Sequence, residues 1–273
     1  MRKILLLTVL LMFVSMSNVF ASDEVKVFVR DVTDTRSMSS SRFHLDVNFI
    51  GEIAQEAIGI TNISIKKAVD DSGRDLRKDS QGNNFRESRG NIIQTRISLE
   101  SPRRSSQSIE VVSGVVEFYV PKNDKNSNIE VESFMTLLGQ PIESDILKEN
   151  NIELIVLTKD EYQEYNKTQA DAKDAGGKMA EGFAQIFGNM FGGSSSDYDL
   201  FIAIKDPSKR LIKIQLCDKD GGEIDDQGTS WGTDYIKYRM KNLPDAEAKM
   251  IVYIKTSDSL VKKDFTIKNI PLP

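Results

Sequence analysis

The sequence predicts an all-β protein made of two β-sandwich domains with a helical insertion between them. Runs in which apolar and polar residues alternate recur along most of the chain, and such alternation is typical of strands with one buried face. Clusters of Gly, Pro, Asp and Asn separate the runs at short intervals. This spacing favours a sandwich over a parallel α/β sheet. One segment, 160–192, has a helical period instead.

Residues 1–21 are expected to form a secretory signal peptide. Arg2 and Lys3 precede an apolar run of 11 residues, 4–14, and the segment ends at a small residue, Ala21. This is the layout of a secretory signal. The run is shorter than the roughly 20 apolar residues of a membrane-spanning helix. A retained N-terminal anchor is the alternative, and no later segment is apolar enough to span a bilayer.

The first domain, 22–159, is expected to contain five strand-like runs: 43–49, 63–65, 96–100, 108–120 and 151–158. In the first run the apolar residues share one face, and the polar residues His44, Asp46 and Asn48 share the other. Within 108–120 the alternation changes phase at Ser113–Gly114, where we expect a bulge or bend. The last run is apolar enough to be buried on both sides.

The insertion, 160–195, is expected to hold an amphipathic helix followed by a Gly/Ser linker. Its apolar stripe, spaced for one helical face, consists of Met179, Phe183, Ile186, Phe187 and Met190. Gly182 and Gly188 weaken the intrinsic helicity, so the helix needs a surface to cover the stripe. The chain's own sandwich, an envelope protein partner, a membrane surface and disorder are the alternatives.

The second domain, 196–273, is smaller and again rich in alternating runs: 198–206, 211–217, 234–241, 249–256 and 263–269. Cys217, the only cysteine, ends one of them and is expected to be a small buried hydrophobe. A single cysteine excludes an internal disulfide. The predicted core of both domains consists of Phe43, Leu45, Val47, Ile63, Ile65, Ile109, Val111, Phe118, Ile152, Leu154, Leu200, Ile202, Ile212, Ile214, Val252 and Phe265.

The two domains are expected to be degenerate copies of one immunoglobulin-like unit. The stretches Asp70–Leu76 and Asp218–Ile224 share the pattern D-x-x-G-x-acidic-aliphatic. Downstream, Pro102 and Pro244 follow the segments 88–90 and 230–232 at equal intervals. The match is imperfect, because the strands that follow are out of phase by one residue.

Several of these motifs resemble a group of exported bacterial proteins, of planctomycete type, that have no assigned activity. The resemblance rests on "AVDDSG" at 68–73, "LESPRR" at 99–104 and the closing "FTIKNIPLP" at 265–273, which match an "AvDDtG" turn, a loop before a strand and a terminal F-x-x-x-x-(I/V)-P-L-P. It covers most of the mature chain and implies a secreted β-sandwich. It implies no functional residues.

The acidic, glycine-bearing stretches are interpreted as turns rather than calcium loops. An EF-hand loop needs Gly at position 6 and Glu at position 12, between helices. Both stretches fail this pattern and follow strands. Asp and Gly are also the residues that form turns between strands. A weak oxygen-ligand site at Asp218, Asp220, Asp225 and Asp226 is the alternative.

No catalytic, metal or cofactor site is predicted. His44 is the only histidine and is interpreted as an exposed bystander; one His and one Cys are too few for a zinc site. A G-x-S-x-G nucleophile elbow is absent from the sequence. Trp231 is expected to be a packed corner, and stacking on a sugar or peptide is its alternative.

The predicted function is an exported, non-enzymatic binding or structural module of the bacterial envelope, periplasmic or secreted. The alternative is a carboxylate-dependent hydrolase of envelope polymer, because any two of 41 acidic residues can converge in a fold. The mature chain has 34 basic and 41 acidic side chains, which argues against a nucleic-acid partner. The basic stretch 62–105 is interpreted as a solvated face.

Overall fold

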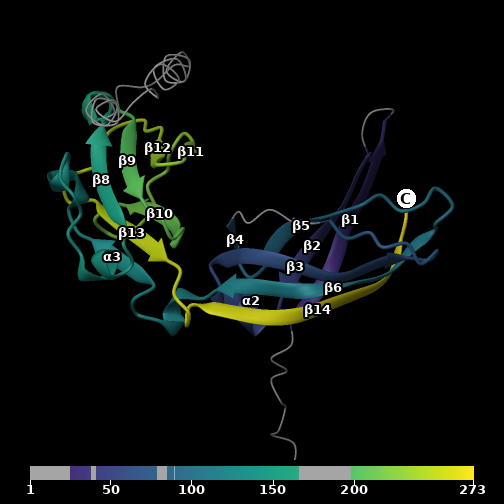
Figure 1. Ribbon diagram of the computed structural model, residues 1–273. Helices are drawn as coiled ribbons and strands as arrows, with labels where there is room; N and C mark the ends of the chain where they lie inside the picture. The colour runs from purple at the N-terminus through teal and green to yellow at the C-terminus, as the bar shows by residue number, and fades with distance from the viewer. Residues whose placement is uncertain (1–24, 38–40, 79–84, 89, 166–197) are drawn as a thin grey trace, which may run out of the picture. The chain divides into compact units, whose positions relative to one another are not determined.

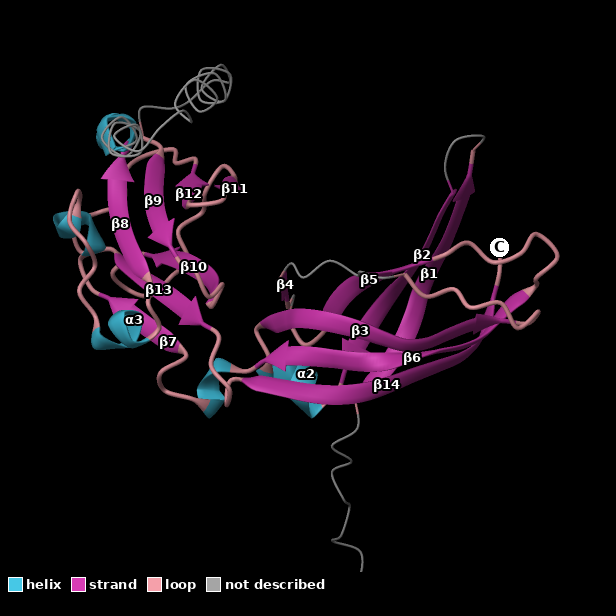
Figure 2. Cartoon of the chain, in the orientation of Figure 1, coloured by secondary structure: helices cyan, strands magenta, loops and turns pink. Residues whose placement is uncertain are grey.

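The computed structural model describes residues 25–37, 41–78, 85–88, 90–165 and 198–273 (Figure 1). Within these ranges fourteen strands form four antiparallel sheets, and the helices are short (Figure 2). The predicted all-β class is confirmed. The expected signal peptide, 1–21, and most of the expected helical insertion, 160–195, lie outside the described residues. None of the described helices is long and apolar enough to cross a bilayer.

The chain divides into two compact units. Unit 1 runs to Val120 and also contains Val261–Pro273, whereas unit 2 is Pro121–Leu260. This division differs from the predicted boundaries, because β8 (Glu153–Thr158) pairs with β9 (Leu200–Lys205) across the expected insertion. The two strands therefore share a sheet and cannot belong to separate domains.

Unit 1 is a sandwich of two sheets, one in the order β1-β2-β5 and the other in the order β14-β6-β3-β4. The short helix α2 (Glu52–Glu56) connects β2 to β3. Its strands are β1 (Lys26–Arg36), β2 (Ser41–Ile50), β3 (Gly59–Asp70), β4 (Arg86–Glu87), β5 (Ile93–Leu99), β6 (Ser108–Tyr119) and β14 (Leu260–Pro271).

The core of unit 1 lies between these two sheets. Phe49 of β2 makes edge-to-face contacts with Phe118 of β6 and Phe265 of β14, at ring-centroid distances of 6.0 and 5.4 Å. Edge-to-face aromatic pairs add to the stabilisation that burial alone provides. The apolar residues of β2 are almost fully buried, which places the polar residues of that strand on the outer face.

Unit 2 also has two sheets around one core, in the orders β8-β9-β12-β11 and β10-β13-β7. Its elements besides β8 and β9 are η1 (Pro121–Asn123), β7 (Asn128–Val131), η2 (Phe134–Leu137), α3 (Asp145–Glu149), β10 (Leu211–Cys217), β11 (Thr229–Trp231), β12 (Tyr235–Tyr238) and β13 (Lys249–Ile254). Phe134 and residues of all the long strands fill the core.

The predicted core is mostly correct, with one shift of phase. Ile109 is buried as expected, but Val112 is fully buried in place of Val111, which is partly exposed. The register of β6 on β3 slips here, so that Glu110 is an extra residue on β6. A second slip lies opposite Ser113–Gly114, where a bulge was expected, and its extra residue is Lys66 of β3. Bulges shift the alternation, which explains why Val111 was misplaced.

The two acidic stretches are turns of the same geometry. Oδ1 of Asp70 accepts hydrogen bonds from the amides two and four residues later, at 3.0 and 2.9 Å. Oδ1 of Asp218 does the same at 2.9 and 2.8 Å. The third residue after each aspartate has positive φ, 79° at Gly73 and 87° at Gly221, a conformation that glycine adopts without strain. The carboxylates therefore hold the turns together.

Candidate functional site

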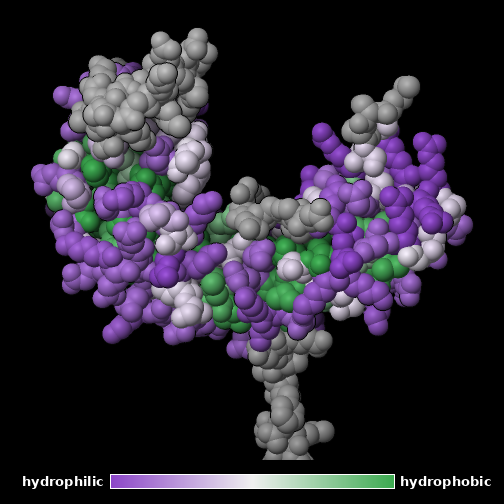
Figure 3. Space-filling view, viewed as in Figure 1, coloured by the Kyte–Doolittle hydropathy of each residue, from purple (hydrophilic) through white to green (hydrophobic). Residues whose placement is uncertain are grey.

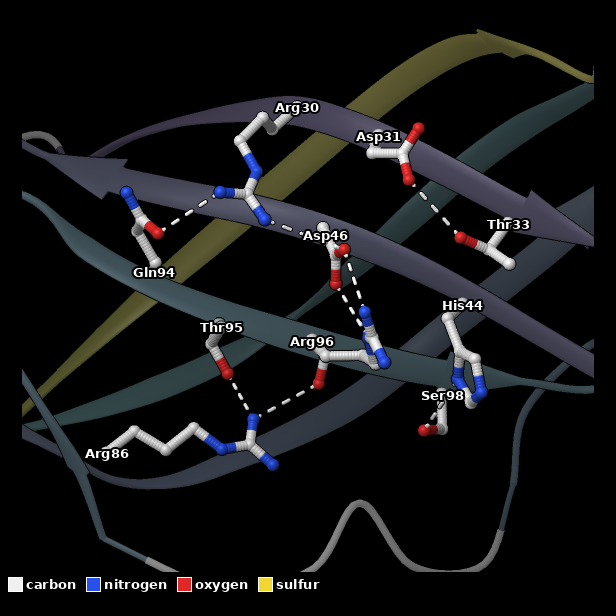
Figure 4. A network of polar contacts seen from close by, with 10 residues as sticks. All are labelled: Arg30, Asp31, Thr33, His44, Asp46, Arg86, Gln94, Thr95, Arg96 and Ser98. Atoms are coloured by element: carbon white, nitrogen blue, oxygen red, sulfur yellow. Dashed lines mark hydrogen bonds and ion pairs between the residues drawn. The ribbon is translucent and has the colours of Figure 1, made fainter.

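The outer face of the β1-β2-β5 sheet carries a cluster of polar side chains (Figure 4). The predicted alternation of β2 is confirmed, because the apolar side chains are buried while His44, Asp46 and Asn48 take the alternate positions. The neighbouring strands add Arg30 of β1 and Arg96 of β5. We define the outer face by these five residues together with Phe28, Asp31, Thr33, Gln94 and Ser98.

An Arg–Asp–Arg cluster forms the centre of the outer face. Arg96 donates two hydrogen bonds to Asp46, Nε to Oδ1 at 2.7 Å and a terminal nitrogen to Oδ2 at 3.0 Å. Arg30 places a terminal nitrogen 3.7 Å from the same carboxylate and donates to Oε1 of Gln94 at 3.2 Å. The hydrogen bonds from Arg96 lower the pKa of Asp46. Both arginine side chains remain about half exposed.

A β-bulge positions Arg30. Val29 pairs with Val47 and Asp31 pairs with Asp46, so Arg30 is an extra residue of β1 without a partner of its own on β2. An extra residue changes the direction in which a strand presents its side chains. The guanidinium reaches across β2 to Gln94 on β5 (Figure 4). The polar cluster therefore spans all three strands of the sheet.

His44 belongs to the outer face and is less exposed than expected. It is half-buried, and its Nδ1 lies 3.1 Å from Oγ of Ser98 on β5. Burial and the positive charges of Arg96 and Lys78 lower the pKa of His44, although Asp46 raises it. The lowered pKa favours the neutral imidazole, which shares a hydrogen bond with Ser98.

One end of the outer face is apolar and exposed. Phe28 is 52 % exposed, and it pairs in register with Asn48, which pairs in turn with Gln94. Oδ1 of Asn48 is buried and accepts no hydrogen bond from the described residues. Surfaces that bind proteins are enriched in aromatic and arginine side chains, and this face carries both kinds.

A third arginine, from the other sheet of unit 1, contacts β5 at the edge of the β1-β2-β5 sheet. One terminal nitrogen of Arg86, on β4, donates hydrogen bonds to Oγ1 of Thr95 and, at 3.2 Å, to the carbonyl oxygen of Arg96 (Figure 4). Burial and the neighbouring Arg96 lower the pKa of Arg86. The basic stretch 62–105, predicted to be a solvated face, contributes Arg86 and Arg96 to this polar cluster.

One face of the β8-β9-β12-β11 sheet of unit 2 carries an aromatic cluster. Phe201 of β9 stacks on Tyr162 at a centroid distance of 4.4 Å, and Tyr162 also contacts Tyr235 of β12. Tyr162 lies in a helical turn, 159–165, that follows β8. Lys237 forms an ion pair with the buried Asp199 at 2.8 Å and lies over the Phe201 ring. In unit 2, Tyr162 therefore covers part of this sheet with an aromatic side chain.

Trp231 is not the packed corner that was expected. It lies on the short edge strand β11 and is 53 % exposed. The following Gly232 leaves no space for a side chain, because an added Cβ would lie 2.2 Å from the Tyr235 ring. A glycine is therefore required in the tight hairpin that follows Trp231. Hydrophilic residues cover most of the visible surface around both units (Figure 3).

Two of the four candidate metal ligands, Asp218 and Asp226, accept hydrogen bonds from the chain itself. Asp218 accepts the hydrogen bonds of its turn, as described above. Asp226 accepts hydrogen bonds from the amide of Gly228, at 3.0 Å, and from the hydroxyl of Thr229. Within the described ranges no three His, Cys, Asp or Glu side chains come close enough to hold a metal ion. These hydrogen bonds account for both acidic stretches as turns.

The lone cysteine is buried, as expected. Cys217 at the end of β10 is 1 % exposed. Burial, followed by the nearby carboxylates of Glu223 and Asp218, raises the pKa of its thiol. A thiol is reactive only as the thiolate, so Cys217 is held in its unreactive form.

The sequence predicted the polar side of β2 but not its partners. Arg30 and Arg96 are brought to Asp46 by strand pairing between segments distant in the chain, and no local pattern marks such pairing. Comparison of the chain with family models, with characterised proteins and with solved structures gave no match.

Proposed function

We propose that the chain is an exported, non-enzymatic binding module of the bacterial envelope, periplasmic or secreted. The observation that carries this proposal is the outer face of the β1-β2-β5 sheet. It combines exposed Phe28, two half-exposed arginines and a buried acceptor on Asn48. Arginine and aromatic residues dominate the binding energy of protein interfaces, so the partner is a protein.

The strand orders support two immunoglobulin-like domains. Such a domain pairs its seven strands as A-B-E-D in one sheet and C-F-G in the other. In unit 2, the order β8-β9-β12-β11 follows the first pattern, and β10-β13 follows C-F. In unit 1, the orders β1-β2-β5 and β3-β6 follow A-B-E and C-F. We infer that the units are copies of one repeat, and the identical turns after β3 and β10 support this.

The geometry of Asp46 favours binding over carboxylate-dependent hydrolysis. A glycosidase needs one carboxyl group whose pKa is raised, so that it can donate a proton. The pKa of Asp46 is lowered by its hydrogen bonds to Arg96. Its neighbour Asp31 is exposed. The Arg–Asp–Arg cluster instead keeps two guanidinium groups in fixed positions for a ligand.

The test uses mature protein immobilised for capture of envelope proteins, followed by titration with the purified captured protein. A variant with Phe28→Ser and Arg30→Glu is expected to weaken binding more than tenfold, as loss of central interface residues does. Arg77→Glu is the matched control, because Arg77 is equally exposed and paired with Asp75. Equal binding by the face variant and the control would refute the proposed face.

A further inference from the structure

Each unit has one sheet that contains the C-like and F-like strands, β3 and β6 in unit 1 and β10 and β13 in unit 2. The strand beside the F-like strand in each sheet comes from an unexpected part of the sequence. β7 follows β6 directly along the chain, after η1, yet it pairs with β13 of unit 2. β14 follows β13 directly, yet it lies beside β6 of unit 1. Two repeats folded one after the other would have β7 beside β6 and β14 beside β13. The two final strands have therefore changed places.

We infer that β7 and β14 are exchanged final strands, and that the β6 edge of unit 1 is a strand-acceptor site that also takes β14 from a second copy of this chain. The inference goes beyond the proposed function and does not involve the outer face of the β1-β2-β5 sheet.

Specific contacts fit β14 to the β6 edge. The amide of Leu272 donates to the carbonyl of Gln107 at 2.9 Å, and Lys262 lies 3.6 Å from the carboxylate of Glu117. These contacts fix an antiparallel direction over most of the strand. Phe265 lies between them and is 4 % exposed.

Gly114 of β6 makes room for the incoming strand. An added Cβ would lie 3.1 Å from the Phe265 ring and 2.2 Å from the carbonyl oxygen of Ser64. A side chain at this position would therefore displace either β14 or β3. The acceptor edge is shaped for an aromatic residue at the place where β14 carries Phe265.

A second copy carries the same strand and can make every one of these contacts. Exchange of an identical element between two copies changes only the hinge and is a common route to dimers. The hinge here is the turn between β13 and β14, where the amide of Thr256 donates to Oγ of the fully buried Ser259 at 3.0 Å.

The outer edge of β14 is unsuited to pairing with a further strand. β14 is the edge strand of its sheet, it carries Lys262, Lys263 and Lys268, and Asn269 interrupts it with a φ of 52°. Lysines and irregularities at an edge oppose the addition of another strand. The exchanged assembly therefore closes as a reciprocal dimer rather than growing into a fibre.

The test places a cysteine pair across β6 and β14 in the full chain: Glu117→Cys with Lys262→Cys, in a Cys217→Ala background. The protein is unfolded, refolded at low and high concentration, and oxidised. At low concentration we expect an intrachain disulfide. At high concentration we expect a covalent dimer, with a doubled mass by light scattering. Folded monomer with only intrachain disulfide at every concentration would overturn the inference.

The matched control is Ser64→Cys with Val115→Cys, which pairs β3 with β6. This disulfide stays within one chain even in the dimer. A second variant needs no refolding: deletion of Ser257 and Asp258 shortens the hinge between β13 and β14, and we expect the shorter hinge to favour pairing of β14 with the β6 edge of a second copy. We expect this variant to be a folded dimer when expressed, and any other product would count against the inference.

Discussion

At the scale of single residues, Asp70 shows how a carboxylate can be buried without a cationic partner. It is fully buried, and its two oxygens accept hydrogen bonds from Ser72, Arg74, Arg103 and Ser106. Burial raises its pKa, but these hydrogen bonds outweigh burial and hold the pKa well below its usual range. Donors that satisfy a buried charge make that charge stabilising.

Removal of this carboxylate is expected to be costly. Asp70→Ala removes the buried acceptor of five hydrogen bonds and should lower the free energy of unfolding by about 3 kcal/mol. Asp218→Ala is the matched control in unit 2, because it removes an exposed carboxylate from a turn of the same geometry. This substitution should lower the free energy of unfolding by about 1 kcal/mol. Urea unfolding of both variants measures the difference. Equal losses of unfolding free energy in the two variants would show that burial of Asp70 does not add to its stabilising effect.

Asp70 also predicts an acid sensitivity. Its pKa is lower in the folded than in the unfolded chain, where it is about 3.9, so the unfolded chain binds the proton first as pH falls. The stabilisation is therefore complete above about pH 5 and declines as the pH falls below the unfolded pKa. The melting temperature should fall between pH 5 and 3, and less so in Asp70→Asn, which cannot titrate. Parallel pH profiles would contradict this account.

At the scale of elements, local alternation predicted strands well and their partners poorly. The run 43–49 was assigned correctly, including the polar side that became the candidate face, because burial on one side leaves a signal in every second residue. The places of β7 and β14 leave no such signal. Pairing is decided by contacts between distant segments, and bulges such as that at Arg30 depend on the partner strand as well.

The pairing of β7 with β13 and of β14 with β6 predicts which unit each strand stabilises. Phe265→Ala should lower hydrogen-exchange protection in β2, β5 and β6 of unit 1 by the equivalent of about 3–5 kcal/mol, and leave β9 unchanged. Ile129→Ala in β7 should lower protection in β13 by about 2 kcal/mol and leave β6 unchanged. The reverse pattern would show that each strand pairs within its own repeat in solution.

At the scale of the whole molecule, each unit has its own core and is expected to unfold as its own cooperative block. Phe49 and Phe134 are fully buried in units 1 and 2, respectively. Each Phe→Ala variant should lower the stability of its own unit by about 3–5 kcal/mol. Scanning calorimetry should then show two transitions. A single transition lowered equally by both variants would argue for one block.

The N-terminal residue of the mature protein tests the prediction that the protein is exported. Mature protein isolated from the envelope should begin at Ser22, because Ala21 ends the predicted signal peptide. Sequencing of the first residues of the isolated protein measures this directly. Protein that keeps Met1 and stays with the membrane pellet would support the retained anchor instead.

The buried thiol of Cys217 has a practical consequence. The side chain lies at the end of β10, an edge strand of its sheet, so a thiol reagent can reach it only when that edge of unit 2 opens. In a single-cysteine chain the rate of labelling therefore reports one local opening event, without any engineered probe. The same shielding keeps the thiol from forming mixed disulfides while unit 2 stays folded.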